Sequence, residues 1–517
     1  MQTMHFSSAF RRWLPFLTVC FILVLTFLIL LPLKNPPSLD DGLRHVTIGR
    51  LMAENGISSV KGWGDFFFAG YFSQRNSDPW FLSDVLFMPL SRLPLVTALK
   101  ISIVTSLTLI LLSAWLFFRL LRLTPLATSS LLLLLACGEM PFYSRLFLAR
   151  PFPLMTAIVI LTVTAVLNRK WIALLPLLCI ATLLSHLFVL PLGVAVIGAL
   201  WLGSLREKKM AFRVAGAAVA GVLLGLLLHP SSLSYTHYLA TVFIRIPFLF
   251  GRRADMGSEM YSAFSAGPSA AIPVTGALIL MTIFALYTLG IPPKTLHKEG
   301  FSFVASLTAL FLCAFLLWMR ALDVLWPLLI LTIALLIRIA PELPRKILLL
   351  FFSPPVKRIT TIAPLVLLFF FSVYLQRTSA FFLRTNRLHA LSRLHALSLI
   401  PPGSRVLNPD WGLFPLFFAV RPDLLYATGI DSNFTYLQDP EASALLALPD
   451  DLELHPEKPV PDISRWLSQL LTHFPAQYIA FPTQGKEKLV FLMRKSPLVK
   501  ELSADTTLTI FEVLPQP

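Results

Sequence analysis

Residues 13–33 read WLPFLTVCFILVLTFLILLPL, an uninterrupted apolar run of 21 residues without a single charged side chain. A helix needs about 20 predominantly apolar residues to cross the hydrocarbon core of a bilayer. The run follows the basic pair Arg11-Arg12, but it is too long for a signal peptide and lacks a small-residue cleavage site. It therefore predicts an uncleaved first membrane span.

Similar apolar runs recur along the first three quarters of the chain. Hydrophobic residues make up 56% of the 517 positions and charged residues only 14%, whereas about a quarter of a soluble domain is charged. The runs are continuous rather than alternating, which favours helices over barrel strands. We expect about eleven spans, near residues 13–33, 97–118, 123–138, 152–167, 171–184, 187–203, 212–228, 270–290, 301–319, 324–339 and 359–375.

The net charge of +16 reflects basic residues at the ends of these runs rather than a surface that binds nucleic acid. Basic clusters fall on one side of the predicted bundle, which we expect to be cytoplasmic. The N-terminus would then be cytoplasmic, and the loop 34–95 and everything after residue 376 would be extracytoplasmic. Residues 171–203 control this topology, because two passes that turn near Ser185-His186 give an odd count and one pass would reverse every later loop.

The composition changes from about Arg377, where long apolar runs stop. Short segments with strand character predict a small α/β domain over 377–517, separate from a transmembrane domain over 1–376. The expected elements are strands at Arg405–Leu407, Leu425–Ala427, Tyr478–Phe481 and Thr507–Val513, with a helix near Ile463–Phe474. The predicted fold class is thus a polytopic α-helical membrane protein with a small C-terminal α/β soluble domain.

The segment after the first span, residues 36–56, reads PPSLDDGLRHVTIGRLMAENG. Ser38 can cap a short amphipathic helix that lies along the membrane surface and ends at Gly56. Asp40 and Asp41 would then lie at the outer mouth of the first span, where a carboxylate can accept a proton or bind a divalent cation. The alternative is that both are acids favoured by the helix dipole.

An acidic pair outside the first span, followed by a helix and a long external loop, resembles the first external loop of the GT-C glycosyltransferases. That superfamily includes protein mannosyltransferases, oligosaccharyltransferase catalytic subunits and aminoarabinose transferases. The resemblance implies that Asp40 and Asp41 are catalytic or metal-binding acids. The segment from Asp78 to Pro89 resembles the part of such loops that leads into the second span, although the His-Pro-Pro signature of many relatives is absent.

Further candidates lie on the same predicted outer side. The resemblance implies that Glu139 is a metal ligand beside Asp41, with Mg or Mn as the expected cation, and that Arg320 binds the lipid phosphate. Arg145 and Arg150 are further candidates for binding this phosphate. The alternatives are that Arg145 and Arg150 anchor the membrane interface and that Arg320 pairs locally with Asp323. Secondary candidates are His45, His186 and Asp78, although His186 is more simply a buried neutral histidine.

Two functions remain open from the sequence. The first is a membrane glycosyltransferase that moves a sugar from a polyprenyl-phosphate donor to an acceptor on the extracytoplasmic face, in a bacterial inner membrane. The second is a non-catalytic protein, either a transporter of lipid intermediates or an assembly subunit. The expected partners are the lipid bilayer and the lipid-linked donor, with no nucleic acid.

Overall fold

The computed structural model describes residues 8–37, 41–137, 142, 145–246, 291–317, 321–342, 391–429, 432–454, 462–505 and 507–515. The chain forms two compact units. The helical unit comprises residues 1–33, 100–227 and 257–385, and the sheet unit comprises residues 34–99, 228–256 and 386–517. The predicted spans at 270–290 and 359–375, and the predicted domain boundary at 376, lie outside the described residues.

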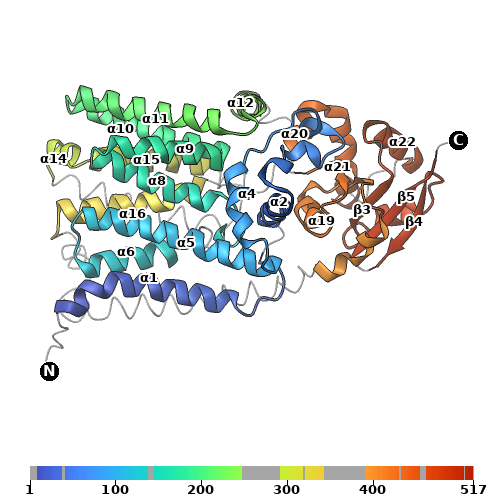
Figure 1. Cartoon of the computed structure of the whole chain (residues 1–517), viewed down its shortest axis with the longest axis horizontal. Coiled ribbons are helices and arrows are strands. Elements are labelled where there is room, and N and C mark those ends of the chain that lie inside the picture. The colour runs from blue at the N-terminus through green and yellow to red at the C-terminus, as the bar shows by residue number, and fades with distance from the viewer. Residues whose placement is uncertain are drawn as a thin grey trace. The chain divides into compact units, whose positions relative to one another are not determined.

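The helical unit contains long apolar helices that run side by side, in blue to green and yellow in Figure 1. The predicted spans that fall on described residues form helices whose ends agree within a few residues. The elements are α1 (Ser8–Leu30), α5 (Leu95–Leu120), α6 (Pro125–Cys137), α8 (Phe152–Leu167), α9 (Trp171–Leu184), η4 (His186–Phe188), α10 (Val189–Ser204), α11 (Lys208–Leu228), α14 (Pro293–Lys298), α15 (Phe301–Leu317) and α16 (Leu322–Ile339).

Length and hydropathy qualify five helical segments of the described chain as candidate membrane spans. These are Arg12–Leu30, Leu95–Leu120, His186–Ser204, Lys208–Leu228 and Leu322–Ile339. The other apolar helices of the unit are 10–17 residues long. The chain is thus an integral membrane protein by the character of its helices.

The segment that controls the topology folds as two helices. The chain breaks after α9 at Ser185, whose extended backbone starts the short turn η4 and whose hydroxyl accepts a hydrogen bond from the Leu187 amide at 3.3 Å. Helix α10 follows directly, and both α9 and α10 pack on α8. The predicted turn near Ser185-His186 is therefore correct.

The basic ends of several helices meet at one end of the helical unit. Arg169, after α8, pairs with Glu207, after α10, at 2.7 Å. Trp201 near the end of α10 donates its indole N–H to the backbone carbonyl of His297 in α14 at 2.9 Å. In Figure 1 these helix ends lie together on the left, as the alternating direction of successive helices requires. The basic residues after α8 and in α14 are thus gathered at one end of the helical unit.

The sheet unit is built on a mixed five-stranded sheet in the order β2-β1-β3-β5-β4. Strands β1 (Arg405–Leu407), β2 (Leu425–Tyr426), β3 (Tyr478–Pro482) and β5 (Leu508–Val513) match the predicted strands, and β4 (Val499–Ala504) is an additional edge strand. β2, β1 and β3 are parallel, whereas β5 is antiparallel to both β3 and β4. The helices in the C-terminal part of the sheet unit are α19 (Phe414–Val420), α20 (Ser432–Gln438), α21 (Pro440–Leu454), α22 (Ile463–His473) and α23 (Glu487–Met493). Two 3-10 segments, η10 (Leu391–Leu399) and η11 (Trp411–Leu413), accompany them.

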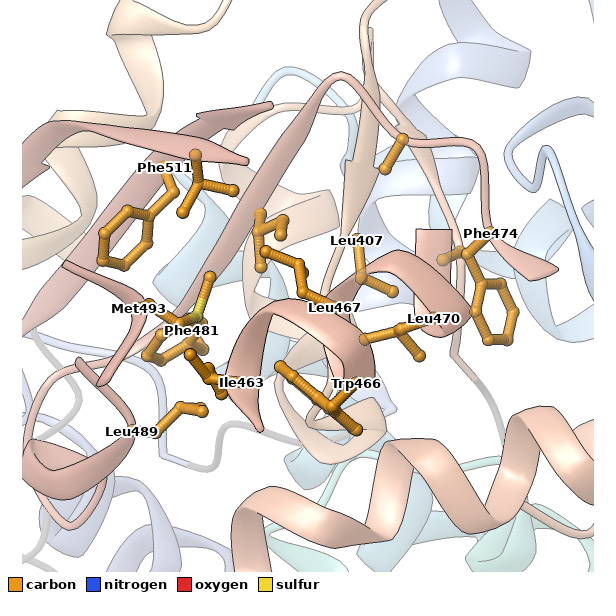
Figure 2. Packing of buried hydrophobic residues seen from close by; sticks show 14 of the residues in the cluster. Leu407, Ile463, Trp466, Leu467, Leu470, Phe474, Phe481, Leu489, Met493 and Phe511 are labelled. Carbon is orange, nitrogen blue, oxygen red and sulfur yellow. The ribbon is translucent and has the colours of Figure 1, made fainter. Parts of the chain in front are cut away.

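Helix α22 covers this sheet with one apolar face, as the sequence predicts. Asp462 caps the helix by accepting hydrogen bonds from the amides of Ser464 and Arg465. Trp466, Leu467 and Leu470 recur at helical spacing and are buried. Figure 2 shows these side chains against Leu407, Phe481 and Phe511 of the sheet, with Leu489 and Met493 of α23 completing the core.

The segment 34–99 is part of the same unit. Residues 66–68 lie along the β2 edge, where the Tyr426 amide donates to the Phe66 carbonyl at 2.9 Å and the Phe68 amide donates to the Tyr426 carbonyl at 3.2 Å. The elements of this segment and of 228–256 are α2 (Gly42–Asn55), η1 (Ile57–Ser59), η2 (Trp63–Asp65), α3 (Gly70–Gln74), α4 (Phe81–Phe87), η3 (Met88–Leu90), α12 (Ser232–Ala240) and the π-helical η5 (Thr241–Arg245).

Candidate functional site

Helix α2, which follows the predicted acidic pair, is enclosed by protein. It ends before Gly56 as predicted, but it begins at Gly42, and every residue from Gly42 to Gly49 is buried. The helix packs on α4 and on α19. A Cβ at Gly49 would lie 2.6 Å from the Phe87 Cβ, so glycine permits the close approach of α4. The expected amphipathic helix on the membrane surface is therefore wrong, because apolar side chains of α4 and α19 cover it.

Asp41 occupies the N-cap position of α2 without making a side-chain capping bond. Its carboxylate instead pairs with Arg44 at 3.2 Å, and its side chain is 23% exposed. The backbone carbonyl of Asp41 accepts the first helical hydrogen bond, from the His45 amide at 3.1 Å. Asp41 is thus held by the first turn of α2, while Asp40 lies outside the described residues.

The guanidinium of Arg44 is buried between two indole rings. Its central carbon lies 4.1 Å from the ring centroid of Trp80 and 5.2 Å from that of Trp63, and the residue is 1% exposed. Planar stacking and cation–π attraction favour arginine in such a position. The arginine that orients the Asp41 carboxylate is therefore itself fixed.

Two fully buried acids lie next to this arginine. Asp78 accepts hydrogen bonds from the Trp63 indole at 3.2 Å and from the Trp80 amide at 3.0 Å, and the side chain of Asp84 lies within hydrogen-bonding reach of it. Asp84 lies 2.5 Å from Nδ1 of His45. Burial raises the pKa of Asp78, and burial together with the negative charge of Asp78 raises the pKa of Asp84 well above its usual range.

The residues that follow α11 also contact the cluster of Arg44, Asp78 and Asp84, through the backbone of Asp78. His229 donates from Nε2 to the Asp78 carbonyl at 2.9 Å, and its Nδ1 accepts from the Ser231 amide at 3.2 Å. Tyr235 stacks on the His229 ring with centroids 4.2 Å apart. Burial lowers the pKa of His229 to about 4 and raises the pKa of Tyr235. The histidine is therefore neutral near pH 7.

In the helical unit, two of the predicted phosphate-binding residues line one small cavity. Arg145 pairs with Asp323, in the first turn of α16, at 2.6 Å. Arg150, Phe152 and Thr156 also line this cavity, whose volume of about 10 Å³ suits roughly one water molecule. Asp323 thus pairs with Arg145. Arg320, which the sequence analysis offered as a local ion-pair partner of Asp323, lies outside the described residues.

Of the remaining sequence candidates, His186 is half-buried in η4, and Glu139 is outside the described part of the chain. Within the described residues, no group of three or more His, Cys, Asp or Glu side chains could hold a metal ion. A metal site that includes Asp41 and Glu139 therefore stays a prediction.

The structure brings together three of the predicted residues, Asp41, His45 and Asp78. It adds Arg44 and Asp84, which the sequence analysis did not select. The sequence signal for Asp84 is a lone acid among apolar residues in the segment from Pro79 to Pro89. An acid in such surroundings is mostly buried and bonded or functional.

Solved structures share this fold across nearly the whole chain. ArnT from Cupriavidus metallidurans bound to undecaprenyl phosphate matches at 13% identity and a TM-score of 0.57, covering 97% of this chain and 99% of ArnT. The oligosaccharyltransferase AglB from Archaeoglobus fulgidus, in complex with an inhibitory peptide and a dolichol-phosphate, matches at 12% identity and 0.52, covering 95% of this chain and 72% of AglB.

A third match is the arabinofuranosyltransferase AftD from mycobacteria, at 17% identity and a TM-score of 0.52, covering 98% of this chain and 40% of AftD. No protein-family model and no curated protein matches the chain. The likeness is therefore one of fold, and the three matched proteins are all GT-C glycosyltransferases. The chain has the GT-C fold.

Proposed function

We propose that this chain is a membrane glycosyltransferase that moves a sugar from a polyprenyl-phosphate donor to an acceptor hydroxyl on the extracytoplasmic face. The observation that carries the proposal is Asp41, a partly exposed carboxylate that a buried arginine orients at the start of α2. The fold shared with ArnT bound to undecaprenyl phosphate supports a lipid-linked donor.

The chemistry assigns one role to the acid and another to the arginines. The acceptor oxygen attacks the anomeric carbon, the bond from that carbon to the phosphate oxygen breaks, and the Asp41 carboxylate accepts the hydroxyl proton. The polyprenyl phosphate leaves with an additional negative charge. Arg145, Arg150 and Arg320 are proposed to bind that phosphate, because guanidinium groups bind phosphate oxygens in a bidentate way.

The topology that we propose is the one predicted from the sequence. Eleven spans with a cytoplasmic N-terminus, in a bacterial inner membrane, would place the loop 34–95 and the C-terminal α/β domain on the extracytoplasmic side. The gathering of basic helix ends supports a common cytoplasmic end. Cysteine labelling of single variants in intact cells, at Lys208 and at Lys500, would show whether these positions lie on opposite sides.

Transfer from radiolabelled polyprenyl-phosphate sugars by the purified protein tests the function. Asp41→Asn is expected to lower the rate at least about a hundredfold, because the amide cannot accept the proton. Glu54→Gln is the matched control, since Glu54 is an exposed acid on the same helix. Undiminished transfer by Asp41→Asn would remove the mechanism, and lipid-phosphate binding without transfer would favour a non-catalytic role.

A further inference from the structure

The buried carboxyl groups of Asp78 and Asp84 lack enough hydrogen-bond donors for two negative charges. Asp78 Oδ1 accepts from Trp63 and Trp80, and Asp84 Oδ1 contacts His45 Nδ1. Their other oxygens, Asp78 Oδ2 and Asp84 Oδ2, are buried and accept no N–H or O–H bond from other groups of the described residues. A proton between the two side chains would satisfy both oxygens at once.

The charges around the pair lead to the same conclusion. Arg44 is the only permanently charged cation among the groups that interact with the pair in the described residues, because His45 is charged only if it is protonated, and Arg44 also pairs with Asp41. From α12 and the turn before it the pair faces His229 and Tyr235, which are both uncharged near pH 7. α19, which packs on α2, contributes no titratable side chain. One arginine cannot offset two buried carboxylates together with the partly exposed carboxylate of Asp41.

We propose that Asp84 keeps its proton at neutral pH, donates it to Asp78, and in this uncharged form acts as a positioning residue for Asp41. The Asp84 carboxyl donates to Asp78 and accepts from Nδ1–H of a neutral His45. The cluster then holds two negative charges, on Asp78 and on the partly exposed Asp41, against one arginine. No bond other than O–H is involved, and the proton stays between the two carboxyl groups.

Two connections run from this acid pair to Asp41. His45, bonded through its ring to Asp84, donates its backbone amide to the Asp41 carbonyl. Trp63 and Trp80, both donating to Asp78, enclose the guanidinium that binds the Asp41 carboxylate. The backbone and the side chain of Asp41 are therefore both fixed through the pair. The role assigned to Asp41 rests on the proposed function; the shared proton does not.

The proton is tested by infrared spectroscopy of the full-length protein in an ester-free detergent. The wild type at about pH 7 should show the carbonyl stretch of a protonated carboxylic acid. In Asp84→Asn this band should disappear, because the amide replaces the protonated acid and leaves Asp78 ionised. A difference spectrum without such a band would overturn the shared proton.

The positioning role is tested by comparing Asp84→Asn with Asp84→Ala. Asn keeps one donor toward Asp78 and one acceptor toward His45, so it should retain slow hydrogen exchange at the amides of α2 and sugar transfer within about threefold of wild type. Ala removes both bonds and should speed exchange in the first turn of α2 and lower transfer about tenfold or more. Equal losses in both variants would show that Asp84 acts as an anion and would overturn the proposal.

The two proposals fail separately. If the wild type transfers no sugar from any polyprenyl-phosphate donor, the proposed function fails. In that case the infrared band and the exchange difference between the Asn and Ala variants still decide whether the acid pair shares a proton and fixes α2. If transfer occurs and the band is absent, the function stands and the shared proton is wrong.

Discussion

Arg145 and Asp323, 178 positions apart in the sequence, form an ion pair 2.6 Å long inside the helical unit. The aspartate is 5% exposed and the arginine 19% exposed. Arg145→Gln removes the guanidinium that lies 2.6 Å from a buried carboxylate and should lower the free energy of unfolding by about 3 kcal/mol. Thermal unfolding in detergent, calibrated by reversible denaturation, measures the loss.

The matched control for this pair is Arg169–Glu207, whose side chains are 37% and 35% exposed. Glu207→Gln should cost at most about 1 kcal/mol, because solvent screens an exposed ion pair. The double variant Arg145→Gln with Asp323→Asn should recover much of the stability lost in Arg145→Gln. Additive losses in the double variant would mean that the pair itself contributes little.

Gly221 and Gly225 let α11 approach α9 closely. A Cβ at Gly221 would lie 2.5 Å from the Leu175 carbonyl oxygen, and one at Gly225 would lie 2.6 Å from the Thr182 Cβ. Small residues four apart are typical of close helix packing in membranes. Gly221→Ala should therefore lower the thermal midpoint, at a cost of about 1–3 kcal/mol.

Gly216 provides the control on the same helix, since a Cβ there meets no atom within 4 Å. Gly216→Ala should leave the stability unchanged or raise it by up to about 1 kcal/mol, through helix propensity. Similar midpoints for Gly216→Ala and Gly221→Ala would contradict the packing assigned to α11.

The depressed pKa of His229 makes the stability of the protein depend on pH. Its folded-state pKa of about 4 lies below the ordinary value of 6.5, so the native protein binds fewer protons than the unfolded chain between these values. This residue should therefore add to the free energy of unfolding as the pH rises across that window, by roughly 3 kcal/mol. The difference in unfolding free energy between wild type and His229→Gln should change by that amount across the window in a pH series of unfolding curves.

Asp84 contributes in the opposite direction, because its pKa is raised in the folded state. Its stabilisation is fully present below the unfolded value of 3.8 and is lost progressively as the pH rises from there through the folded value, so it opposes the His229 contribution over the same window. Above pH 6.5 the His229 contribution is complete, so a decline in unfolding free energy there should belong to groups such as Asp84. A His229→Gln curve as steep as that of wild type would show that burial of this histidine does not shift its pKa.

Hydrophobic patterning was enough to predict the apolar helices of the described chain and most of the sheet. The runs in the helical unit are long and continuous, and Tyr478–Pro482 and Leu508–Val513 are short apolar segments bounded by turns. The edge strand β4 was not predicted, because its mostly exposed residues, including Lys500 and Glu501, show no alternation of apolar and polar side chains. An edge strand is defined by its pairing partner, which a local pattern does not contain.

The candidate site could be predicted only in part. Asp41 was found because an acidic pair follows the first predicted span, and His45 lies in the same segment. Arg44 and Asp84 depend on contacts between α2 and residues about 20 to 40 positions later, and a charged residue in sequence gives no sign that it will be buried. The enclosure of α2 by α19, far along the chain, could not be read from the local amphipathic pattern.

The contact between the first loop and the C-terminal sheet makes a last prediction. Phe67 is 5% exposed, its ring centroid lies 4.8 Å from that of Phe414, and its backbone forms an isolated bridge with Tyr426 at the β2 edge. Phe67→Ala would leave a cavity against Phe414 and should lower the free energy of unfolding by about 3–5 kcal/mol. Phe491→Ala is the control, because Phe491 is 55% exposed in the same unit and should change stability by about 0.5 kcal/mol or less.

Since the β2 edge also loses its partner when residues 66–68 are absent, a fragment of residues 391–517 should bind a hydrophobic dye and unfold without cooperativity. A cooperative fragment with native stability would show that the sheet does not need the first loop.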